Sequence, residues 1–157
     1  MTEAEHFLVF ALDGGRYALP LAAIERVVRA VEVTALPSAP AVVLGMIDVE
    51  GSVLPVLSLR RRLGLPDREV VPADQYLIVR TGGRRVVLAI DEARAVLAFS
   101  AAEITARSEI EPGLNPIQGV ARLSDGLALI HDLPTFLSLA EADALDEAMG
   151  LEADYAI

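Results

Sequence analysis

An all-β fold with short helices, built from small barrels or a sandwich, is the fold class that this sequence predicts. Short apolar runs separated by glycine and proline recur at roughly 8–12-residue spacing, which is typical of such folds. The chain is 54% apolar and only 4% aromatic, so we expect an aliphatic core. Its 157 residues suffice for one domain, or for two small units packed together.

The chain also repeats itself, which favours two similar units. In each half an apolar run leads into a Gly-Gly-Arg turn, the pattern of a β-hairpin; the turns are Gly14–Arg16 and Gly82–Arg84. Further along, Gly45, Gly51 and Leu59 of the first half correspond in order to Gly119, Gly126 and Leu133 of the second. Two small barrels would each be marginal alone, so we expect a third apolar layer between them.

Strands and helices follow from local pattern. The β-branched and leucine-rich run Val53–Leu59, after the turn at Gly51, predicts a buried strand. Spacing of apolar residues after Pro20 predicts a short helix with Leu21, Ile24, Val27 and Val28 on one face.

Two capping boxes predict further helical turns. Ser100 with Glu103 indicates one turn, and Ser138 with Glu141 indicates the start of a C-terminal helix. Ala142, Leu145 and Met149 would form the buried face of that helix, Asp143, Asp146 and Glu147 its solvent face, and Gly150 its end.

Charge is concentrated at the ends of the chain. The net charge is −10, yet residues 7–70 carry seven acids and seven arginines, and residues 76–137 carry seven acids and six arginines. An acidic protein of this kind is not expected to bind nucleic acid or to insert into an anionic membrane. No apolar run approaches the length of a membrane span, and no signal peptide is recognisable. The sequence also has no cysteine, so we expect a cytoplasmic protein.

The sequence predicts no enzyme, no cofactor and no metal site. His131 and Asp132 are adjacent at the end of an apolar run, where neighbouring side chains of a strand point to opposite faces and cannot form a dyad. A partly buried histidine is the expected state of His131. Arg60–Arg62 is the one basic cluster, and we interpret it as a solvated turn, with a partner-facing patch as the alternative.

Several motifs, in order, resemble the CheW-like coupling proteins of bacterial chemotaxis. Ile24–Val27 resembles the family's Val-x-Glu-Val, and Gly45–Gly51 resembles Gly-x-x-Asn-x-Arg-Gly. Val53–Arg60 resembles Val-x-Pro-Val-x-Asp-Leu-Arg, while Phe7–Pro20 and Ile117–Asp132 resemble the opening hairpin and the closing half.

The resemblance implies two pseudo-repeated five-stranded SH3-like β-barrels packed together. A single domain would span 1–150, with one subdomain at about 13–70 and the second at about 76–137. Strand 7–12 is a candidate partner of the second subdomain, a helix would span 138–150, and a tail would span 151–157.

The function implied is that of an adaptor between chemoreceptors and a CheA-type histidine kinase. Its partners would be the regulatory domain of the kinase and the cytoplasmic tip of a receptor, which docks in an apolar groove. The expected partner-binding residues are Ile24, Arg26, Val27, Gly45, Ile47, Asp48, Glu50, Gly51 and Arg60.

Two departures from the family motifs reverse charge together. Arg26 stands where the family has Glu, and Glu50 stands where it has Arg, while Asp48 replaces Asn and Ser58 replaces Asp. Our hypothesis is a swapped Arg26–Glu50 ion pair that affects the choice of partner; independent drift of two surface residues is the alternative. The reversal weakens the expectation of an ordinary receptor contact.

A second class of function stays open at this point. The chain could be a ligand-binding or hydrolytic small barrel with a pocket near His131 and Asp132. A filled interior and an exposed apolar groove near Ile24, Ile47 and Gly51 would favour the adaptor.

Overall fold

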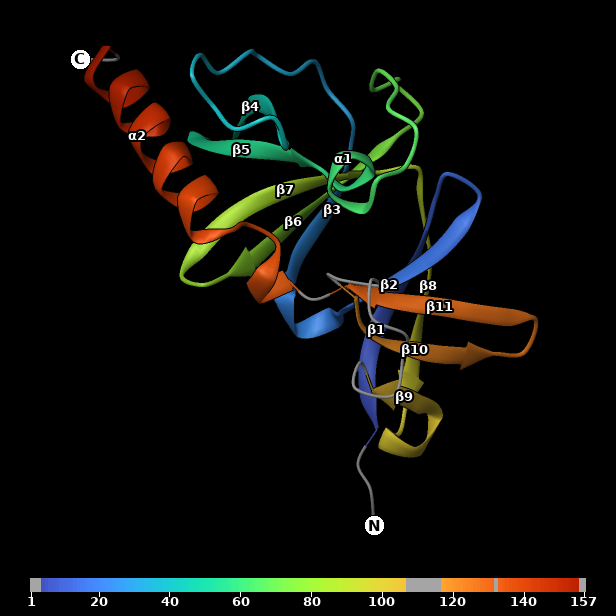
Figure 1. The fold of residues 1–157 in the computed structure, drawn as a ribbon. Coiled ribbons are helices and arrows are strands. Elements are labelled where there is room, and N and C mark those ends of the chain that lie inside the picture. Colours follow the sequence, from blue (N-terminus) through green and yellow to red (C-terminus); the bar gives the residue numbers. More distant parts are fainter. Residues whose placement is uncertain (1–3, 107–116, 132, 156–157) are drawn as a thin grey trace.

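The computed structural model describes residues 4–106, 117–131 and 133–155, and shows two β-sheets with a C-terminal helix (Figure 1). The strands are β1 (Glu5–Leu12), β2 (Gly15–Pro20), β3 (Ile24–Arg29), β4 (Val43–Val49), β5 (Ser52–Ser58), β6 (Gln75–Thr81), β7 (Arg84–Ile90), β8 (Glu92–Phe99), β9 (Ile104–Ala106), β10 (Ile117–Leu123) and β11 (Gly126–His131). The helices are α1 (Leu59–Leu63) and α2 (Leu139–Tyr155), with 3-10 turns at Leu21–Ala23, Ala101–Glu103 and Leu133–Thr135.

The two sheets exchange strands between the halves of the sequence. The first sheet has the order β3-β6-β7-β5-β4, and the second has the order β8-β1-β2-β11-β10-β9. Each contains one parallel pairing, β5 with β7 and β2 with β11, at equivalent positions. Each barrel therefore joins the opening hairpin of one repeat to the remaining strands of the other repeat.

This exchange differs from the expected subdomain boundaries. Residues 15–20 lie in the second sheet instead of the first, and residues 75–90 lie in the first sheet instead of the second. The second sheet also has six strands, because the short β9 pairs with β10. Strand β1 does pair within the second barrel, with β2 and β8.

The internal repeat is confirmed by two equivalent glycines. A Cβ at Gly45 would lie 2.2 Å from the carbonyl oxygen of Thr34, and one at Gly119 would lie 2.9 Å from that of Thr105. Both glycines follow a shift of register, in β4 and in β10. Only glycine permits these close approaches of two backbones.

Three apolar layers hold the molecule together, as expected. Ile47, Leu54, Val56, Tyr76, Ile78 and Val87 fill the first barrel. Phe7, Val9, Ala18, Phe99, Ala121, Ala128 and Ile130 fill the second. The largest cluster lies between the barrels and includes Phe10, Leu19, Leu77 and Leu88, together with Leu145 and Ala148 of α2.

Two local predictions were wrong. Residues 24–29 form a strand, not a helix, and only Leu21–Ala23 makes a 3-10 turn. The C-terminal helix does not end at Gly150 but continues to Tyr155. Both predicted capping boxes are present, at Ser100 with Glu103 and at Ser138 with Glu141.

Candidate partner-binding surface

Strand β3 lies at an edge of the first sheet (Figure 1). A line of apolar side chains runs along it. Val27 is opposite Leu77 and Ile24 is opposite Val79, so both side chains lie on the sheet face that carries the layer between the barrels. Ile24 is half-buried there, whereas Val27 is 38% exposed and Leu21, just before β3, is equally accessible. This line could contact an apolar partner without any rearrangement of the core.

The β4–β5 turn lies beside β3 and carries charge. Glu50 and Gly51 both have positive φ, 49° and 88°, in a two-residue hairpin turn. The Asp48 carboxylate accepts a 2.8 Å hydrogen bond from the Gly51 N–H, which stabilises the turn. The turn thereby holds Glu50 in a left-handed conformation that is unfavourable for a residue with a side chain.

Arg26 and Glu50 form the expected ion pair. Nη1 of Arg26 donates to Oε1 of Glu50 at 2.8 Å, and this hydrogen bond lowers the pKa of Glu50. The Glu50 side chain is 76% exposed, so the pair contributes little to stability. A charged pair that is fixed in orientation beside an apolar line is well placed to select partners.

A second ion pair on β3 was not foreseen. Glu25 accepts hydrogen bonds from Arg85, at 2.9–3.1 Å, and pairs with Arg80 at 2.7 Å. These bonds lower the pKa of Glu25, with Arg85 as the main cause. The two arginines flank the Gly-Gly turn of the β6–β7 hairpin, and that spacing was the available signal.

Two expected site residues serve the interior instead. Ile47 is buried inside the first barrel, so its side chain does not reach a partner. Gly45 lies against the backbone of Thr34, where it permits the bridge between Thr34 and Met46.

Arg60 is also internal, which corrects the interpretation of Arg60–Arg62 as a solvated turn. Arg60 lies in the first turn of α1, one residue after the helix begins at Leu59, and is only 9% exposed. The guanidinium donates to Asp91 at 2.8 and 3.0 Å and to Asp13 at 3.1 Å. Because Asp13 belongs to the β1–β2 turn, this network connects the two barrels.

Arg68 extends the network with two bonds to Asp74 and one to Asp91, each of 2.8 Å. Burial raises the pKa of Asp74, but the bonds from Arg68 and from the Val71 N–H outweigh that effect and bring the pKa below its ordinary value. The sequence shows Asp91 only as half of an acidic pair at a strand end, with no sign of its distant partners.

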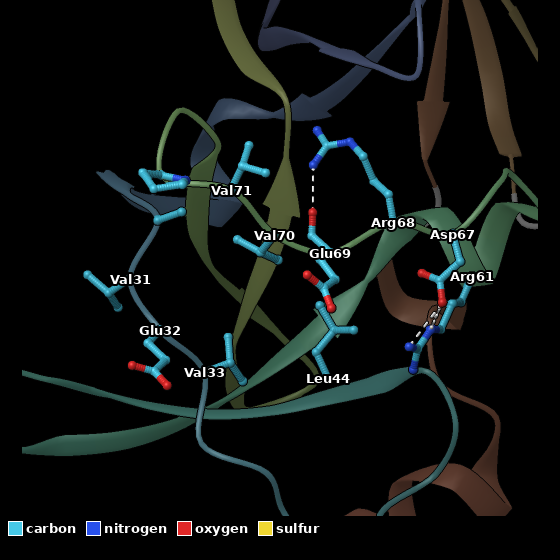
Figure 2. Close-up of a pocket in the computed structure, with 12 residues that line it drawn as sticks. Val31, Glu32, Val33, Leu44, Arg61, Asp67, Arg68, Glu69, Val70 and Val71 are labelled. Atoms are coloured by element: carbon cyan, nitrogen blue, oxygen red, sulfur yellow. Dashed lines mark hydrogen bonds and ion pairs between the residues drawn. The ribbon is translucent and has the colours of Figure 1, made fainter.

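A cavity of about 780 Å³ opens at one end of the first barrel (Figure 2). Val33, Leu44 and Val70 line it, and all three pack against the barrel core. Tyr76 holds one wall by donating a 2.6 Å hydrogen bond to the Val31 carbonyl. Among the described residues, its lining combines aliphatic side chains with internally paired arginines and offers no nucleophile beside a base.

His131 does not form a reactive site within the described residues. It is 1% exposed, and neither ring nitrogen has a hydrogen-bond partner there. Burial, with the nearby charge of Arg62, lowers its pKa to about 4. Asp132 lies outside the described residues, and His131 is not among the described residues that line the cavities of about 780, 710 and 20 Å³.

In residues 4–106, 117–131 and 133–155, no group of histidine and acidic side chains could hold a metal ion. No helix in this described part has the length and apolarity that crossing a bilayer requires.

Comparison with known proteins gives a consistent result. The family model of the CheW-like domain matches residues 6–141. The chain is 29% identical over 105 residues to the chemotaxis protein CheW of Bacillus subtilis, covering 67% of each chain. It is 27% identical over 129 residues to CheW of Helicobacter pylori, covering 82% of this chain and 78% of the relative.

The fold agrees with a solved structure. The scaffolding protein TtCheW from Thermoanaerobacter tengcongensis superposes with a TM-score of 0.79 at 23% identity, covering 90% of this chain and 96% of that one. At this identity the similarity shows the fold alone.

Proposed function

Because the chain belongs to the family of CheW-like domains, we propose that it is a non-catalytic adaptor that couples chemoreceptors to a CheA-type histidine kinase. The observation that carries the proposal is the surface around β3, called here the β3 surface, which consists of Leu21, Ile24, Val27, Arg26 and Glu50. There an exposed apolar line stands beside the fixed Arg26–Glu50 pair, while the described core is filled. Such a surface acts by binding. We place the adaptor in the cytoplasm, where both partners present the surfaces it would bind.

A helical receptor tip is the partner that we propose for the β3 surface. Helix-in-groove recognition needs an apolar line with a few polar groups at its edge. Leu21, Ile24 and Val27 would supply the line, and Arg26 and Glu50 the edge. The kinase would bind through its regulatory domain, and Arg60 would contribute indirectly, by fixing the two barrels relative to each other.

Reversed charge makes the proposal specific. The motifs that this chain resembles carry Glu and Arg where it has Arg26 and Glu50. A partner built for the ordinary arrangement would meet like charges here, which disfavours binding. We therefore propose that the chain serves its own receptor and kinase in a diverged signalling array.

The adaptor role is tested by co-purification from the cells that make the protein. We expect the tagged chain to retain a histidine kinase and a chemoreceptor. Val27→Asp should lose the receptor and keep the kinase, while Asp143→Asn on α2 serves as the control. Recovery of a small metabolite, with neither protein partner, would contradict the adaptor role.

The ion pair is tested by a double-mutant cycle on receptor binding. Arg26→Glu and Glu50→Arg alone each place like charges together, and each should weaken binding about tenfold, or about 1.4 kcal/mol. The double variant restores the pair in the opposite orientation, so its loss should be smaller than the sum of the two single losses, although binding stays weaker than that of the parent chain. Effects that simply add would refute the coupling, and the non-contacting combination of Arg26→Glu with Asp143→Arg is the additive control.

A further inference from the structure

The second barrel is open along a seam between β8 and the end of β10. A cavity of about 710 Å³ lies in this seam. Its lining comes from β1, the β1–β2 turn, the start of β2, β8, the end of β10 and the β10–β11 turn: Val9, Ala11, Gly14, Gly15, Arg16, Arg94, Ala95, Leu97, Ala98, Phe99, Arg122, Leu123, Ser124 and Asp125. The cavity shares no residue with the β3 surface, so it is a separate feature of the molecule.

An inward-facing leucine shows that this barrel wall is incomplete. Leu97 is opposite Phe7 and Ala95 is opposite Val9, so their side chains lie on the face that carries the second barrel's core. Phe7 and Val9 are buried, yet Leu97 is 37% exposed. Within the described residues nothing covers it from the side of β10.

The first barrel is closed at its edges by its own chain. Thr34 bridges to Met46 on the edge strand β4, and Val70 packs against the barrel core from a connecting segment. The second barrel has the equivalent of the bridge, since β9 pairs with β10. Among the described residues it has no equivalent of Val70, which leaves the seam open.

The backbone edge of β8 is accessible beside the seam. Among the described strands β8 pairs only with β1. The Gln75 side chain accepts a 2.6 Å hydrogen bond from the Ala93 N–H, so the first part of the edge is covered. The edge from Arg94 to Ala98 is uncovered, and Val96 there is about half exposed. An accessible strand edge with exposed apolar residues favours the addition of another strand.

Charge in the seam has the opposite sign to the whole molecule. The lining carries three arginines and one acid, in a chain of net charge −10. Arg16 is held by Asp125, with Nη2 3.0 Å from its carbonyl oxygen, and Arg94 pairs with Glu92 at 2.9 Å. Arg122 has no ion-pair partner among the described residues. Guanidinium groups in this arrangement favour carboxylates.

We propose that the seam binds an acidic, extended segment of a partner protein, which adds to β8 as a further strand. The main chain of the segment would pair with the β8 edge between Arg94 and Ala98. Alternate apolar side chains would cover Leu97 and Leu123, and carboxylates would meet Arg94 and Arg122. Five residues of strand span about 16 Å, which suits a short linear segment better than a folded surface.

The test uses three synthetic peptides and methyl NMR of the full chain. The first alternates glutamate with leucine over eight residues, the second replaces glutamate by lysine, and the third is the glutamate peptide with methylated backbone nitrogens. We expect the first alone to shift the methyl signals of Val9, Leu97 and Leu123. A lysine peptide that binds equally well, or shifts located elsewhere, would overturn the proposal.

Single variants test the recognition of carboxylates and the apolar contact separately. Arg122→Glu and Leu97→Asp should each weaken binding of the glutamate peptide at least tenfold, and Arg29→Glu, an equal charge change at an exposed site on β3, should not. No effect of Arg122→Glu would overturn the charge argument, and undiminished binding of the methylated peptide would overturn strand addition. A dimer in sedimentation that Leu97→Asp dissociates would identify the occupant as a second copy and overturn the partner proposed here.

Discussion

Arg62 and His131 are two nitrogen-rich side chains that share one aromatic neighbour in the interior. Arg62 lies 5.6 Å above the centre of the Phe136 ring, and the His131 ring lies 5.1 Å from it. Arg62 also donates to Glu141, at 2.5 Å. A permanently charged guanidinium beside a buried imidazole favours the neutral imidazole, in addition to the effect of burial.

Stability should therefore depend on the protonation of His131. Its pKa falls from 6.5 to about 4 on folding, so the unfolded chain takes up a proton at a higher pH than the folded chain does. The contribution is fully present above pH 6.5 and is lost as pH falls toward 4, with a total of about 3 kcal/mol. His131→Phe should remove this part of the pH dependence, measured by urea unfolding between pH 7 and 4.5.

The variant is compared with His6→Phe, because His6 is exposed near the N-terminus. Carboxylates also titrate near the lower end of this range, so the informative quantity is the difference between each variant and the parent chain. If the His131→Phe profile runs parallel to that of the parent, protonation of His131 does not oppose folding.

At the scale of elements, local chemistry predicted the turns and caps well. The Gly-Gly hairpins, the strand after Gly51 and both capping boxes depend on residues close together in sequence, and all are present. Gly150 was misjudged because a helix tolerates glycine where no left-handed residue is required, and α2 passes through it.

Strand β3 shows why the apolar spacing was misleading. A shift of register between Ile24 and Arg26 breaks the alternation of the strand, so Ile24 and Val27 lie on one face although they are three residues apart. That spacing imitates a helix. The β-branched residues Ile24, Val27 and Val28 were the signal for a strand.

The sequence predicted those parts of the candidate site that depend on the sign of a charge or on the residues of a turn. It did not predict which side chains are buried. The reversed charges of Arg26 and Glu50 pointed to a pair, which the structure contains. The burial of Ile47 depends on which face of β4 meets the core. The burial of Arg60 depends on Asp13 and Asp91, which are 47 and 31 residues away in the sequence.

Helix α2 should stabilise the molecule through one side chain above all. Leu145 is fully buried in the layer between the barrels, whereas Leu139, on the first turn, is largely exposed. Leu145→Ala should lower the free energy of unfolding by about 2–5 kcal/mol, and Leu139→Ala by less than about 0.5 kcal/mol, in urea titrations. Similar losses for the two variants would mean that α2 is not packed as described.

At the scale of the whole molecule, the exchange of hairpins makes each barrel dependent on both repeats. The β1–β2 hairpin completes the second barrel and the β6–β7 hairpin completes the first, so neither repeat contains a whole sheet. The Arg60 network adds a charged connection between the β1–β2 turn and the end of β7. Removing one partner of such a partly buried network leaves the others unpaired, which is costly.

The two barrels should accordingly unfold as one unit. Leu88 of β7 belongs to the layer between the barrels and has no exposed surface. Leu88→Ala should lower the free energy of unfolding by about 2–5 kcal/mol, because it leaves a cavity that both barrels border.

Amide hydrogen exchange is the suitable measurement, since it reports on each strand separately. The slowest amides of β1, in the second barrel, and of β6, in the first, should lose protection by equal amounts. Val53→Ala, at an exposed position on β5, is the control and should leave both strands unchanged. A loss confined to β6 would show that the second barrel holds its structure alone, and that the exchanged hairpins do not couple the two.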